Sequence, residues 1–144
     1  MLKGLFQKTY KKVTFEDLHT AIKTPEKFII INTLPISEQD NLIKTTISIH
    51  MEERIVNELL NLYDFNGRSF IIYGKHVSDT TVESKYDQLC GLGFSDVYMY
   101  PGGLFEWVLL QDIYGFDEFP TTKRVLDILK YKPVKMFGHN LLTY

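Results

Sequence analysis

The chain has 144 residues, the length of one ordinary domain. Hydrophobic residues make up 44% and charged residues 24%, so the composition is that of a globular protein with a sizeable core. The formal net charge of −2 argues against a general nucleic-acid-binding protein. The single cysteine excludes a disulfide framework within the chain and fits a reducing compartment, so we expect an intracellular, cytoplasmic protein.

The charges are unevenly distributed along the chain. Residues 1–12 carry four lysines and no acid, and residues 120–144 carry five basic residues against Asp127, so the segment between them is acidic. This pattern predicts basic ends on an acidic globule; the alternative is that the ends contact an anionic partner. No apolar run approaches the roughly 20 residues of a membrane-spanning helix, and no signal-like apolar stretch begins the chain, so no membrane partner is expected.

Hydrophobic periodicity predicts alternating helices and strands. Thr14 and Asp17 form a capping box, and the helix that follows ends before Pro25. Continuous apolar runs predict buried strands at 28–31 and 69–73. The remaining predicted elements are a short strand over 46–49, a helix over 51–63, a helix from Thr80 or Thr81 to about Leu92, a strand over 97–100, a helix over 104–111, and a last helix capped by Thr121.

This alternation predicts an α/β fold whose sheet is largely parallel and covered on both faces. Ligands bind such sheets beyond the carboxyl ends of the strands, so the loops after Ile31, Tyr73 and Tyr100 are candidate sites. The loop after Tyr73 opens a helix, whose first N–H groups could hold an anion. The alternative is a plain connection in which Asp79 takes the anion's place. The loop residues are Gly74, Lys75, His76, Val77, Ser78, Asp79 and Thr80.

The other reactive side chains predict neither a catalytic site nor a metal site. Cys90 lies late in its helix on the stripe of Tyr86, which predicts a buried small hydrophobe. No two histidines are four residues apart and none stands beside a cysteine, so no metal or cofactor is expected. The histidines are His19, His50, His76 and His139.

Two segments late in the chain are the most informative about a family resemblance. They are Gly-Phe-Ser-Asp-Val-Tyr at 93–98 and Gly-Gly-Leu-Phe-Glu-Trp at 102–107. Together with the segments 13–18, 28–32, 42–47 and 70–73, they resemble the rhodanese-like domain family. The resemblance implies a largely parallel sheet of about five strands with helices on both faces. With the charge pattern and the apolar residues near the C-terminus, we expect three parts: a basic N-terminal segment (1–12), a rhodanese-like domain (13–122), and a C-terminal extension (123–144) packed on the domain or on a partner.

The sequence departs from the family where its chemistry would lie. The family's cysteine, which takes up sulfur as a persulfide, corresponds to Gly74 here. The family's Asp and Arg after the first buried strand are replaced by Asn32 and Leu34, and Thr80 stands where related phosphatases need an Arg. We therefore expect no catalytic residues. The expected function is that of a catalytically inactive rhodanese-like protein, a protein-binding or scaffold module with a vestigial loop at 74–80 that could bind an anion or a partner.

Two alternatives stay open. One is a structural or assembly subunit that self-associates; the other is a sulfurtransferase that uses a non-standard site such as Cys90. The single alanine, Ala21, suggests an A/T-rich genome such as that of a protist or a large DNA virus, so a place in a virion is also open. The C-terminal extension favours a surface for a partner or a second copy. Its apolar residues are Val125, Leu126, Ile128, Leu129, Met136, Phe137, Leu141, Leu142 and Tyr144.

Overall fold

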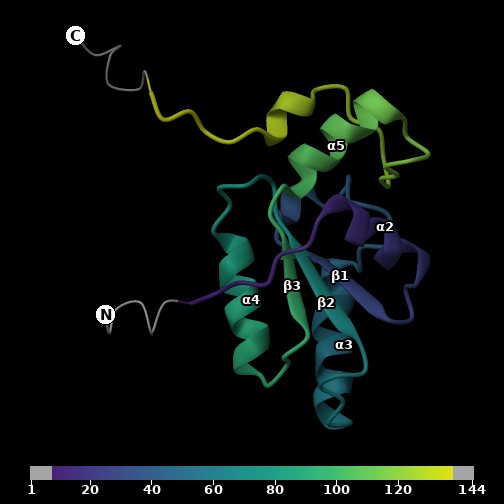
Figure 1. Cartoon of the computed structure of the whole chain (residues 1–144), viewed down its shortest axis with the longest axis vertical. Helices are drawn as coiled ribbons and strands as arrows, with labels where there is room; N and C mark the ends of the chain where they lie inside the picture. The colour runs from purple at the N-terminus through teal and green to yellow at the C-terminus, as the bar shows by residue number, and fades with distance from the viewer. Residues whose placement is uncertain (1–7, 138–144) are drawn as a thin grey trace.

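The computed structural model describes residues 8–137 as a parallel sheet between two layers of helices (Figure 1). The α-helices are α2 (Phe15–Lys23), α3 (Ile49–Asn61), α4 (Thr81–Gly91) and α5 (Gly103–Tyr114). The strands are β1 (Phe28–Asn32), β2 (Ser69–Tyr73) and β3 (Val97–Tyr100), and two 3-10 helices are η1 (Ile36–Glu38) and η2 (Ile128–Tyr131).

The strands lie in the order β1-β2-β3, and both pairs are parallel. Single bridges continue the sheet at its two edges, from Lys12 to Met99 beside β3 and from Thr46 to Ile30 beside β1. The predicted α/β fold with a parallel sheet is therefore confirmed. Three full strands form within residues 8–137, because the two edge segments pair with the sheet only through these bridges.

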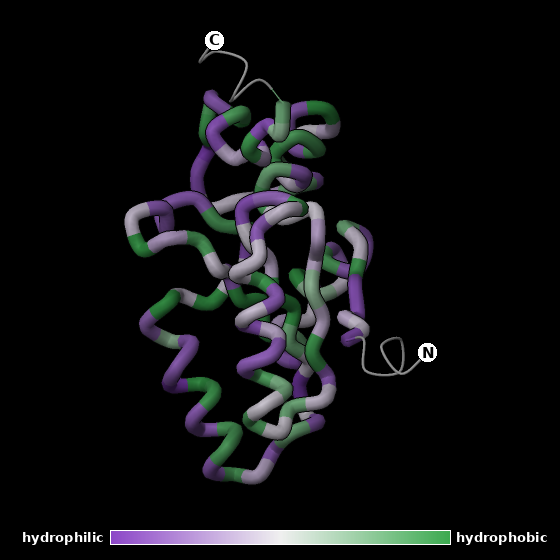
Figure 2. The backbone as a smooth tube through the Cα atoms, turned by 90° about the vertical axis from the view of Figure 1, so that its left-hand side faces the viewer, coloured by the Kyte–Doolittle hydropathy of each residue, from purple (hydrophilic) through white to green (hydrophobic). Residues whose placement is uncertain are grey.

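Successive side chains of each strand point to opposite faces of the sheet, and this divides the core into two layers. Ile30 and Ile71 face α2 and α5, whereas Ile29 and Ile72 face α3 and α4. Figure 2 shows hydrophilic and hydrophobic residues alternating along the helices, as expected for helices that turn one face to a sheet. Trp107 of α5 is fully buried in the first layer, where its indole N–H donates to the carbonyl of Pro120 at 3.2 Å.

Two predicted elements are wrong. The strand predicted over 46–49 is replaced by the single bridge at Thr46, because the Ser48 hydroxyl accepts from the N–H of Met51 and α3 begins at Ile49. The helix predicted after Pro120 does not begin at Thr121. That residue is buried and forms an antiparallel bridge with Ile43, which ties the chain to another loop.

The predicted burial of Cys90 is also wrong, since its thiol is exposed. The buried stripe of α4 consists of Val82, Tyr86 and Leu89. Successive helical residues are about 100° apart, so Cys90 is rotated out of the contact that Leu89 makes.

The segments at both ends of the described chain contact the globule. Lys8 forms an ion pair with Asp87 at 2.9 Å, and Lys123 forms one with Asp40 at 3.3 Å. Beyond Thr122, Tyr131 is 1% exposed and joins the core. The predicted tail residues Leu141, Leu142 and Tyr144 and the histidine His139 lie outside the described residues. No helix among residues 8–137 is long and apolar enough to cross a membrane.

Candidate functional site

The loop 74–80 lies at the carboxyl edge of the sheet, between the residue that follows β1 and the start of α5. The N–H of Thr33 donates to the carbonyl of Tyr73 at 3.0 Å. On the other side, the N–H groups of Leu104 and Phe105 donate to the carbonyls of Gly74 and Lys75, both at 2.9 Å. All three loops predicted as candidate sites therefore meet at this edge.

Gly103 lets α5 begin directly against the loop. Its φ is +66°, and a Cβ at this position would lie 2.7 Å from the carbonyl oxygen of Gly74 and 3.0 Å from the nitrogen of His76. Only glycine fits such a close approach without strain. The second glycine of the Gly-Gly segment thus sets the position of the loop relative to α5.

The carboxylate of Asp79 fills the inside of the loop. One oxygen, Oδ2, accepts from the N–H of Lys75 at 2.9 Å. The other, Oδ1, accepts from the N–H of Thr81 at 3.1 Å and from its hydroxyl at 2.5 Å. The N–H of Thr81 is the first of α4, where an external anion would bind, and the N–H of Lys75 faces the same space from the loop. The chain therefore supplies its own anion.

These hydrogen bonds determine the charge state of Asp79. Burial by itself would raise the pKa of the carboxyl, but the hydrogen bonds from Lys75 and Thr81 outweigh it, and the pKa lies below its usual value. The loop consequently carries a fixed negative charge at neutral pH. A second anion placed here would be repelled by that charge.

The basic residue of the loop is already paired. Lys75 forms an ion pair of 3.1 Å with Glu38 of η1, and both side chains are partly buried. His76 accepts, through Nδ1, from the N–H of Ser78 at 3.2 Å. Val77 is largely exposed. The cation that could have attracted an anionic ligand is thus neutralised by a neighbour from another element.

A side chain at position 74 has no space in this arrangement. A Cβ on Gly74 would lie 2.5 Å from Oδ2 of Asp79, 2.7 Å from Cγ2 of Val82 and 2.9 Å from Oγ1 of Thr33. All three distances are shorter than an ordinary contact. The Asp79 carboxylate therefore occupies the place into which any side chain at position 74 would extend.

Asn32, the last residue of β1, and Leu34, two residues later, have structural contacts. Asn32 exchanges two hydrogen bonds with the side chain of Gln39, at 2.8 and 3.0 Å, and accepts from the N–H of Leu34. Leu34 is 3% exposed and belongs to the core. Both residues stabilise the turn after β1.

Two residues of the site were missed by sequence reasoning, Glu38 and Thr33. The Thr33 hydroxyl donates to that of Thr81 at 2.8 Å, since the hydrogen of the Thr81 hydroxyl is given to Asp79. Thr33 directly follows β1 and Glu38 lies in η1, six residues beyond the strand. Their place in the segment after β1, at the same sheet edge as the loop, is the signal that could have found them. By contrast, Cys90 lies nine residues along α4 from Thr81, which is about 14 Å along the helix axis.

The remaining candidate residues also lie apart from the loop. His19 packs among aromatic rings between α2 and α5, and His50 is exposed in the first turn of α3. Within residues 8–137, no three histidine, cysteine or acidic side chains come together in a group that could hold a metal ion.

Comparison with known proteins gives matches by structure. By sequence, no family model and no curated protein matches the chain. A yeast protein tyrosine phosphatase of the rhodanese family, Ygr203w, is similar with a TM-score of 0.56 at 16% identity, over 85% of this chain and 98% of that one. The single-domain sulfurtransferase RDL2 of Saccharomyces cerevisiae is similar with a TM-score of 0.53 at 17% identity, over 75% and 96%.

The BH2092 protein of Bacillus halodurans has a TM-score of 0.57 at 21% identity, and the match covers 79% of this chain and 77% of that chain. At these identities the likeness is one of fold. The chain has the rhodanese-like fold that its sequence segments resemble.

Proposed function

We propose that this rhodanese-like domain is catalytically inactive and serves as a protein-binding module. The observation that carries the proposal is the position of the Asp79 carboxylate, 2.5 Å from where a Cβ on Gly74 would stand. The resemblance puts the family's cysteine at Gly74, and glycine has no side chain that could attack a substrate. Without a nucleophile there is no covalent intermediate to divide the transfer into two easier steps.

The charges around the loop support the same conclusion. The substrates of sulfur or phosphoryl transfer are anions, and they need donors and cations at the reacting atoms. Here the N–H groups of Lys75 and Thr81 are bound to Asp79, and the ammonium of Lys75 is bound to Glu38. An anionic substrate would have to displace both internal carboxylates.

Exposed apolar side chains support a role in binding. Val134, Met136 and Phe137 are 78%, 83% and 85% exposed in the C-terminal segment. Clustered exposed apolar groups of this kind mark interaction sites. The fold thus offers a rigid scaffold with a contact surface at one end, and its usual reaction site is closed.

Two assays with the full chain test the proposal: sulfur transfer from thiosulfate to cyanide, and hydrolysis of p-nitrophenyl phosphate. We expect no activity above that of buffer in either assay. Cys90→Ser is the matched control, because its thiol is exposed. Turnover that disappears in Cys90→Ser would overturn the proposal in favour of a sulfurtransferase with a non-standard site; turnover that persists would overturn it in favour of another site.

A further inference from the structure

An aromatic cavity lies between α2 and the end of α5. It has a volume of about 440 Å³ and is lined by Phe15, His19, Leu110, Tyr114, Glu118 and Phe119, which we call the aromatic pocket. The rings of Phe15, His19 and Tyr114 surround that of Phe119, with centroids 5.6, 4.8 and 6.1 Å from it. A concave, aromatic surface of this kind suits a large apolar side chain.

The edge of the aromatic pocket is acidic. Glu118 lines the pocket and is exposed, and Asp117, its neighbour in the sequence, is exposed as well. The backbone carbonyl of Glu118 is bound to Nε2 of His19 at 2.8 Å, which holds this segment against α2. The pocket therefore favours an apolar side chain that has cations beside it in the sequence.

The chain itself contains a segment with this pattern. Residues 132–137, which we call the arm, read Lys-Pro-Val-Lys-Met-Phe and follow η2. Val134, Met136 and Phe137 are each more than three-quarters exposed. Figure 1 shows the arm running away from α5, on the side opposite α2. The arm therefore leads away from the aromatic pocket of its own copy.

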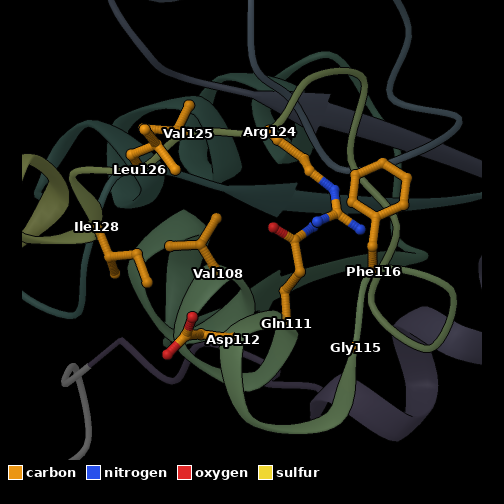
Figure 3. Close-up of a pocket in the computed structure, with 9 residues that line it drawn as sticks. All are labelled: Val108, Gln111, Asp112, Gly115, Phe116, Arg124, Val125, Leu126 and Ile128. Carbon is orange, nitrogen blue, oxygen red and sulfur yellow. The ribbon is translucent and has the colours of Figure 1, made fainter.

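Two other cavities fit the arm less well. The cavity in Figure 3, of about 270 Å³, lies between α5 and residues 124–128, and the guanidinium of Arg124 stands in it over the ring of Phe116 at 4.9 Å. Gln111 and Asp112 line the same cavity, so an apolar side chain would have to desolvate three polar or charged groups there. The groove between α3 and α4 contains the ion pair between Lys85 and Glu52, at 2.7 Å, which an apolar side chain would have to desolvate.

We infer that the arm of one copy of this chain docks in the aromatic pocket of a second copy. Met136 or Phe137 enters among the rings, and Lys132 lies near Glu118 at the edge of the pocket. The inference rests on the proposed binding function and names its partner. Exchange between two copies related by a two-fold axis buries both arms.

Sedimentation equilibrium of the full chain tests this docking. We expect the mass of two or more copies, which falls to that of one copy on dilution. The double variant Met136→Ser/Phe137→Ser and the pocket variant Tyr114→Ser should each weaken association at least about tenfold, the usual effect of losing a buried interface anchor. Leu62→Ser, at a residue 74% exposed elsewhere, is the matched control and should associate like the unaltered chain.

Crosslinking identifies the two surfaces directly. In a Cys90→Ser background, which removes the only other thiol, Val134→Cys protein is mixed with Glu118→Cys protein and a short bis-maleimide, so that Met136, Phe137 and Tyr114 stay in place. The mixture should give a crosslinked pair at a higher yield than either variant alone. A monomeric unaltered chain, association unaffected by the arm and pocket variants, or equal crosslinking in all three samples would overturn the inference. None of these results depends on the turnover assays, which test inactivity separately.

Discussion

The carboxylate of Asp79 accepts a 2.9 Å hydrogen bond from the backbone N–H of Lys75, and by doing so it fills the space in front of Gly74. The two residues are four positions apart in one loop. Because of this contact, the loop before α4 has no room for an external anion, and its N–H donor is bound within the loop itself. Catalytic inactivity in this fold would then come from two linked changes, the missing side chain at position 74 and the internal carboxylate that replaces it.

Restoring the nucleophile alone should not restore activity. We expect Gly74→Cys to lack sulfurtransferase turnover and to lower the free energy of unfolding by about 1–3 kcal/mol, because the new Cβ overpacks the loop. The triple variant Gly74→Cys/Asp79→Gly/Thr80→Arg should be more active than the single one, since it removes the competing carboxylate and adds a cation. The thiosulfate assay and urea unfolding measure both effects. Robust turnover in Gly74→Cys alone would show that the loop had remained competent.

The Asp79 carboxylate should stabilise the fold in a pH-dependent way. Its pKa is depressed in the folded state, so its contribution is fully present above the unfolded value of about 3.9 and is lost as the pH falls through the folded pKa. Asp79→Asn should cost about 1 kcal/mol at pH 7, allowing for partial solvent screening.

Urea unfolding of both proteins between pH 7 and pH 2.5 measures this effect, and the difference between them should shrink toward the acid end. Glu26→Gln, at an exposed carboxyl, serves as the control and should show no such trend. A difference between Asp79→Asn and the unaltered chain that stays constant with pH would contradict the assignment.

Two glycines should respond in opposite directions to the same substitution. Gly103→Ala should lower the free energy of unfolding by about 2 kcal/mol, because its φ is +66° and the new Cβ would meet the carbonyl of Gly74. Gly91→Ala, at the end of α4 with open space around it, should raise it by about 0.4–1 kcal/mol. Thermal unfolding of the two variants provides the test. If both substitutions changed the free energy of unfolding equally, the loop would not be in close contact with the start of α5.

The thiol of Cys90 should react readily in the native protein. It is exposed at the end of α4, so a thiol reagent should label one group per chain, at a rate within a few-fold of that in denaturant. Cys90→Ser should change the free energy of unfolding by less than about 0.5 kcal/mol, as is usual for surface substitutions. Slow labelling that becomes fast only in denaturant would mean that the thiol is covered, for example in an oligomer.

Local patterns in the sequence were sufficient for most of the architecture. The capping box at Thr14, the uninterrupted apolar strands and the glycine pair at 102–103 each act over a few residues. Such short-range signals are read from the chain alone, because hydrogen bonding and burial within one element depend on neighbours in sequence. The parallel sheet and the position of the loop after Tyr73 follow from them.

Contacts between distant segments required the tertiary structure. The ion pair between Glu38 and Lys75, the bridge from Thr121 to Ile43 and the burial of Tyr131 join residues that are far apart along the chain. The exposure of Cys90 depended on a rotation of about 100° around α4, which periodicity does not resolve when two neighbouring residues are both apolar. The sequence by itself shows Gly74, Asn32 and Leu34 at the positions where the resemblance leads one to expect a cysteine, an aspartate and an arginine. That Asp79 fills the space in front of Gly74 was decided only by the tertiary structure. It depends on how three loops pack together at one edge of the sheet, and the sequence of each loop alone does not specify that packing.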